Sequence, residues 1–134
     1  MTPAEARALI LTQHDGLRAL LGTAIRLARQ HVAGEAIEDE LEAVVSAIRV
    51  AFAEHNLFET SLLVPLLGGV DAWGSKRIER MISEHLEEHR VIEAFLARPA
   101  RDVVPDLDDF VEEIGAHMEA EERTFLSPSA LPER

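Results

Sequence analysis

The spacing of apolar residues constrains the fold of this chain more than any other feature. Between residues 2 and 126, four segments carry apolar side chains at steps that alternate between three and four residues. This spacing places the side chains on one face of an α-helix and is typical of the inward seam of a helix bundle. No segment has the strict alternation of a half-buried β-strand. The sequence therefore predicts an all-α protein.

Capping residues and helix breakers divide the chain into four expected helices. The first begins at "TPAE", where Thr2 and Glu5 form a capping box, and Pro99 ends the third. We expect helices over residues 3–32, 35–66, 75–97 and 104–126. Short connections make neighbouring helices antiparallel, which predicts an up-down-up-down four-helix bundle. The length of 134 residues suits a single domain over residues 1–134.

The net charge and the lack of cysteine argue against several classes of binding partner and metal ligand. The formal net charge is −12, whereas nucleic acids and anionic membranes require a basic face on the protein. We therefore expect neither as a partner. The chain has no cysteine, and so no disulfide and no thiolate ligand. It has no apolar run of membrane-spanning length and no signal-peptide pattern, which suits a cytoplasmic protein.

Seven ionisable residues occupy seam positions that should be buried. They are His14, His55, Glu59, His85, His89, His117 and Glu121. A single histidine on an apolar face is usually a hydrogen-bonded core residue. Seven such groups are different, because each buried polar group without a partner costs ~1–3 kcal/mol and a whole domain is stable by only about 5–15 kcal/mol. Imidazoles and carboxylates at helical spacing suit metal ions, which would compensate this cost.

The number of these groups exceeds the four or six ligands that one first-row metal ion accepts. Two ions that share two carboxylates as bridges account for all seven, and bundles are known to hold dimetal sites built from inward side chains. The order differs from the Glu-x-x-His pairs of ferritin-like sites, because here each histidine of a His–Glu pair precedes its glutamate by four residues. Iron, manganese and zinc all accept these ligand types.

These stretches together resemble the hemerythrin-like, or HHE cation-binding, domain family. The resemblance covers nearly the whole chain, from "QHDGLRALL" through "HNLFETSLLVP" and "HLEEH" to "HMEAEERTFLSP". It implies two iron ions joined by an oxo or hydroxo bridge. One iron would take the three histidines His85, His89 and His117. The other would take His14 and His55 and keep an open position, with Glu59 and Glu121 bridging the two.

Glu121 and Glu122 are both candidates for the second bridging carboxylate, because members of the family place this carboxylate either four or five residues after the preceding histidine. Glu121 stays on the apolar stripe and repeats the spacing of His55 and Glu59, which favours it over Glu122. The stretches 55–65 and 117–128 then read as halves of a pseudo-repeat. Each half supplies one terminal histidine and one bridging glutamate.

The resemblance implies O₂ binding at the open iron position, in transport, storage or sensing. A di-iron enzyme on the same site is the main alternative, with peroxidase-like, oxidase or oxygenase activity or nitric-oxide chemistry, so NO and peroxide are also candidate ligands. An iron- or redox-responsive binding module is a third reading. The absence of tyrosine removes a tyrosyl radical and modestly favours O₂ binding. Apolar residues expected to keep water out are Leu17, Phe58, Leu62, Ile92, Ile114 and Met118.

Overall fold

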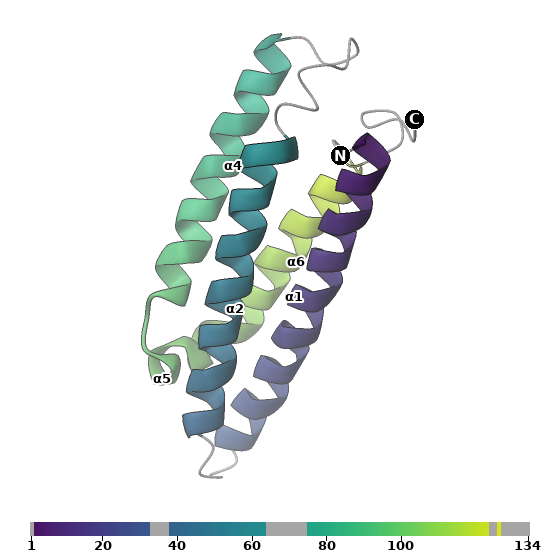
Figure 1. Cartoon of the computed structure of the whole chain (residues 1–134). Coiled ribbons are helices and arrows are strands. Elements are labelled where there is room, and N and C mark those ends of the chain that lie inside the picture. The colour runs from purple at the N-terminus through teal and green to yellow at the C-terminus, as the bar shows by residue number, and fades with distance from the viewer. Residues whose placement is uncertain (1, 33–37, 64–74, 124–125, 127–134) are drawn as a thin grey trace.

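The computed structural model describes residues 2–32, 38–63, 75–123 and 126. Within these ranges the chain is helical and forms no strand. The four long helices are α1 (Pro3–Val32), α2 (Glu38–Phe58), α4 (Ser75–Leu96) and α6 (Leu107–Arg123). Successive helices run in opposite directions (Figure 1). The expected all-α, up-down-up-down antiparallel four-helix bundle is therefore confirmed.

The start of α1 follows from its first residues. The backbone amide of Glu5 donates to Thr2 Oγ1 at 3.1 Å, and the amide of Thr2 donates to Glu5 Oε2 at 3.1 Å. This reciprocal pair is the expected capping box, which satisfies backbone donors that have no partner inside the helix. The helix then continues to Val32, the same end as the sequence predicts.

Two of the other helices differ from expectation. The regular turns of α2 end at Phe58, and the chain continues as a π-helix, η1 (Glu59–Leu63). The expected ends of this helix, at 35–37 and 64–66, lie outside the described residues. The last helix begins at Leu107 and not at 104, because a short turn, α5 (Ala100–Val103), and a 3₁₀ segment, η2 (Val104–Asp106), precede it. Proline, which lacks an amide hydrogen, sits inside η2.

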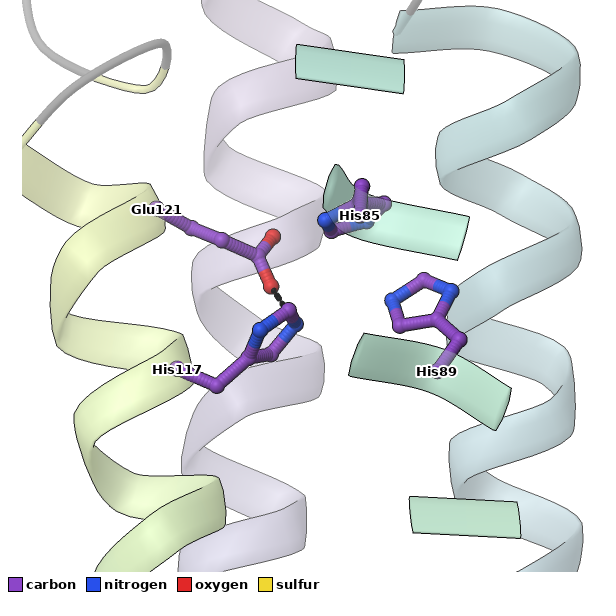
Figure 2. Close-up of side chains that lie close together, drawn as sticks. All are labelled: His85, His89, His117 and Glu121. Atoms are coloured by element: carbon purple, nitrogen blue, oxygen red, sulfur yellow. Dashed lines mark ion pairs between the residues drawn. The ribbon is translucent and has the colours of Figure 1, made fainter. Parts of the chain in front are cut away.

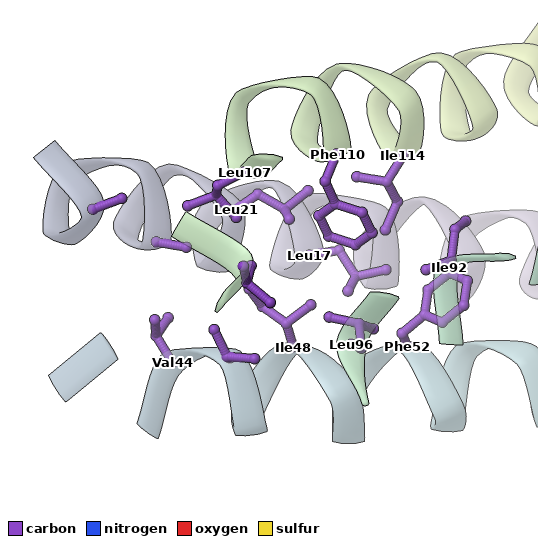
Figure 3. Close-up of a cluster of buried hydrophobic side chains, with 14 of the residues drawn as sticks. Leu17, Leu21, Val44, Ile48, Phe52, Ile92, Leu96, Leu107, Phe110 and Ile114 are labelled. Carbon is purple, nitrogen blue, oxygen red and sulfur yellow. The ribbon is translucent and has the colours of Figure 1, made fainter. Parts of the chain in front are cut away.

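The half of the bundle around the C-terminal end of α1 is an apolar core (Figure 3). Its fully buried members come from all four long helices and include Leu17, Leu21, Ile48, Phe52, Ile92, Leu96, Phe110 and Ile114. Phe95 of α4 stacks on Phe110 of α6, with ring centroids 4.0 Å apart and planes tilted by 8°. Each buried side chain of this size contributes ~1.5–3 kcal/mol, so this half stabilises the bundle with apolar contacts.

None of the described helices is both long enough and apolar enough to cross a bilayer. Buried apolar residues also lie on the other side of the polar seam positions, where Ala6 and Ile10 of α1 are fully inaccessible to solvent. Buried apolar residues of α1 thus lie on both sides of His14 along the bundle axis.

Candidate metal centre

All four long helices contribute to one polar layer. The side chains of the layer are His14 (α1), His55 (α2), Glu59 (η1), His85 and His89 (α4), and His117 and Glu121 (α6). The rings of His14 and His55 lie 4.9 Å apart between centroids, so the two residues meet at nearly the same height in the bundle. Six of the seven residues are buried, and the side chain of His85 is 12% exposed. The structure thus brings together every residue that the sequence singled out.

The first ligand group joins α1, α2 and α6. One side-chain atom from each of His14, His55, Glu59 and Glu121 lies within 4.8 Å of the others. Nε2 of His55 lies 2.8 Å from Oε1 of Glu59. Oxygens of Glu121 lie 3.8 Å from Nε2 of His55 and 3.9 Å from Nε2 of His14. Two imidazoles and two carboxylates therefore converge on one point.

The second ligand group joins α4 and α6 (Figure 2). Its atoms, from His85, His89, His117 and Glu121, also lie within 4.8 Å of one another. Nε2 of His117 lies 2.6 Å from Oε1 of Glu121, and the rings of His85 and His89 have centroids 3.9 Å apart. Glu121 is common to both groups and Glu122 belongs to neither, which agrees with the assignment favoured by the sequence.

The converging atoms are buried yet have no hydrogen-bond partner among the described residues. They are Nε2 of His14, His55, His89 and His117, Oε1 of Glu59, and both carboxylate oxygens of Glu121. Two close approaches among these atoms, His55 to Glu59 and His117 to Glu121, lack hydrogen-bond geometry. Leaving so many buried polar atoms unpaired is costly. Imidazole nitrogens and carboxylate oxygens aimed at a common point fit a transition-metal cation, which would satisfy all of them.

A model of the hemerythrin HHE cation-binding domain matches residues 6–127, a span that includes the whole polar layer. The chain belongs to the hemerythrin HHE cation-binding domain family. Neither the curated proteins nor the solved structures compared with the chain gave a match. Family membership and the converging donor atoms together assign the polar layer as a site for a metal cation. We call the seven side chains of this layer the HHE site.

Protonation differs among the histidines of the HHE site. Burial disfavours charge on His55, but the nearby carboxylates of Glu121 and Glu59 outweigh it and raise its pKa to about 9. Burial also opposes charge on His117, whereas Glu121 and Glu88 raise its pKa. Without a cation His55 therefore holds a proton at neutral pH, and the raised pKa of His117 shifts that ring toward its protonated form. A cation must displace those protons, because only the neutral ring is a ligand.

His14 and His89 are already neutral at neutral pH. Burial lowers the pKa of His14, although Glu121 and Glu122 act in the opposite direction. Burial, followed by repulsion from His85, lowers the pKa of His89 to about 3. Their lone pairs are available to a cation at neutral pH without loss of a proton.

Nδ1, on the far side of the ring, is hydrogen-bonded in three of the HHE histidines. The partner comes from another helix each time: Glu122 for His14 at 3.1 Å, Gln13 for His55 at 2.9 Å, and Glu88 for His117. Such contacts fix the ring orientation of a metal ligand and its tautomer. The sequence did not indicate Gln13 or Glu88, because each directly precedes one ligand but supports a ligand on a different helix.

Near each glutamate of the HHE site, one backbone feature departs from regular α-helical hydrogen bonding. Glu59 opens the π-helix η1. In α6, the carbonyl of Glu121 accepts a hydrogen bond from the amide of Leu126, five residues later, at 3.0 Å. Wide turns of this kind are frequent at functional sites. The pseudo-repeat expected from stretches 55–65 and 117–128 stays a prediction from the sequence.

Proposed function

We propose that this protein holds two iron ions in its polar layer and binds O₂ at one of them. The observation that carries the proposal is that two four-residue ligand groups, joined through Glu121, lie side by side in the bundle. One cation per group accounts for the seven convergent side chains. Iron is the ion that the family resemblance implies, and manganese and zinc would accept the same donor types.

The two ions would have unequal ligand sets. His85, His89 and His117 would hold one and His14 and His55 the other, with Glu59 and Glu121 as the shared carboxylates. Both carboxylates are 2% exposed or less, so water competes poorly for these bridging positions. Because it has one histidine fewer, the ion at His14 and His55 would have a coordination position left for an exogenous ligand.

The surroundings of that position suit a small apolar gas. The side chains of Leu17, Ile92, Ile114 and Met118 are each at most 2% exposed, Phe58 is half-buried, and the side chain of Leu62 lies outside the described residues. As walls of that position, these side chains would limit the access of water and of larger reductants. When bound, the iron pair supplies the electrons and the open position on which reversible O₂ binding depends. Water exclusion by the walls favours release of O₂ unchanged over its reduction.

The optical spectrum of the reduced, iron-loaded protein tests this function. Exposure to air should produce a new visible absorption band that disappears under argon, over repeated cycles, with about two irons per chain by metal analysis. Immediate irreversible oxidation would favour the alternative of a di-iron enzyme acting on O₂, peroxide or NO. A reproducible single zinc per chain would refute the dinuclear site.

A further inference from the structure

His14 is held between two consecutive glutamates of α6. Its Nε2 atom, in the ligand layer, lies 3.9 Å from Oε2 of Glu121, and its Nδ1 atom lies 3.1 Å from Oε1 of Glu122. An ionised carboxylate only accepts hydrogen bonds. Nδ1 of His14 therefore carries the ring proton and donates a hydrogen bond to Glu122. The Nε2 lone pair then points into the layer, where no described residue hydrogen-bonds it.

Glu122 is itself fixed from α1. Nη2 of Arg18 donates to both of its carboxylate oxygens, at 2.8 Å and 3.0 Å. Arg18 lies four residues after His14, so the two side chains leave α1 on the same face. The guanidinium balances the charge of Glu122 and restricts its position, while the side chain of Glu122 remains one quarter exposed. The result is a chain of contacts from Arg18 through Glu122 to the ring of His14.

The other histidine of the same ligand group has a different support. Nδ1 of His55 lies 2.9 Å from Oε1 of Gln13, a neutral amide. A carboxylate partner makes an imidazole a stronger electron donor to a metal than an amide partner does. The two histidines of this group are therefore unequal, and the stronger donor is His14.

We propose that Glu122, held by Arg18, is the positioning residue of this metal position: it fixes His14 with the proton on Nδ1 and Nε2 toward the cation. This proposal rests on the proposed function, since it concerns the ion held by His14 and His55. Glu122 touches no bound cation and acts only through His14. Its removal leaves the seven ligands in place but frees the ring of one of them.

Two measurements on the full chain test this role. Nitrogen-15 NMR of histidine-labelled, metal-free protein reports which ring nitrogen of His14 carries the proton, with the signals assigned through His14→Gln. Zinc titration then reports the affinities of the two positions with a redox-silent probe. The variants are Glu122→Ala, Glu122→Gln and Arg18→Met, and the control is Glu119→Ala, an exposed carboxylate on the same helix. Circular dichroism verifies that each variant is folded.

We expect Glu122→Ala to lose the single Nδ1–H form of His14 and to weaken the lower-affinity zinc position by roughly 10- to 100-fold. Glu122→Gln keeps an acceptor oxygen, so it should preserve the tautomer with a smaller loss of affinity. Arg18→Met should fall between them, and Glu119→Ala should match the parent. An unchanged tautomer together with affinities within about two-fold in Glu122→Ala would overturn the positioning role. Failure of the parent to bind a second ion would instead refute the dinuclear site, while the tautomer measurement would still decide whether Glu122 fixes His14.

Discussion

Glu59 of η1 contacts His85 of α4 across the bundle, although 26 residues separate them in the chain. The same oxygen, Oε2, lies 3.8 Å from His89, whereas Oε1 lies 2.8 Å from His55. One oxygen therefore faces the three-histidine group and the other faces the two-histidine group. A carboxylate that bridges two cations requires this division.

Replacement of Glu59 by glutamine should reduce the iron content from about two ions per chain to about one or fewer. The amide keeps the size of the side chain but offers a single neutral oxygen, so it cannot bridge two cations. Metal analysis of protein purified with iron measures the loss. Glu54→Gln, which alters an exposed carboxylate on α2, should keep both ions. Full iron content in Glu59→Gln would remove Glu59 from the site.

The two histidine sets should respond differently to substitution. His14→Ala leaves the two-histidine ion with one imidazole, so that ion should be lost together with the O₂-dependent absorption band, while about one iron per chain remains. His85→Ala should instead loosen the ion held by His89 and His117. Iron analysis and the optical spectrum under air distinguish the outcomes. Full metal and an unchanged oxygenated spectrum in both variants would contradict the ligand assignment.

Much of the site was predictable because helical periodicity converts sequence spacing into direction. His55 and Glu59, like His117 and Glu121, are four residues apart, and this spacing alone places each pair on one face of a helix. The choice of Glu121 over Glu122 follows from the same rule. A carboxylate one position later points about 100° away around the helix axis, and the structure finds it on the far side of His14.

The supporting contacts were not predictable from spacing. Gln13 reaches His55, and Glu88 reaches His117, only because of the rotation and height that each helix adopts in the bundle. The π-helix that begins at Glu59 is likewise not indicated by the apolar pattern. The later start of α6 follows from the proline in η2. The apolar spacing alone does not reveal this start, because it runs without interruption across η2 and α6.

The apolar half of the bundle should determine stability independently of metal content. Ile48 is 1% exposed, so Ile48→Ala should lower the free energy of unfolding by ~2–5 kcal/mol through lost burial and a cavity. Val50→Ala, two residues away on the exposed face of α2, should change it by no more than about 0.5 kcal/mol. Chemical denaturation measures both, and metal analysis should show parental iron content in each. Loss of iron in Ile48→Ala would show that the two halves are coupled.

The stabilisation that metal gives should depend on pH over a range set by His55. Its pKa in the folded, metal-free protein is raised to about 9, above the ~6.5 of an unfolded histidine. Protonated His55 therefore stabilises the metal-free fold fully below ~6.5, and this contribution is lost as the pH rises through 9. His117, whose pKa is also raised, acts in the same direction.

Metal opposes this trend because it binds only the neutral rings, so each proton on His55 or His117 must leave before the cation enters. Cation binding adds to the free energy of unfolding when the unfolded chain lacks the site. The difference in melting temperature between the zinc-loaded and metal-free protein should therefore widen from about pH 6 to about pH 8. Circular dichroism melts at about pH 6, 7 and 8 measure it, and His55→Gln should flatten the dependence because its side chain has no proton to lose.

Helical signal should persist in the metal-free protein, since buried apolar residues lie on both sides of the ligand layer. A melting difference that is equal at all three pH values would show that proton loss at His55 is not linked to metal binding.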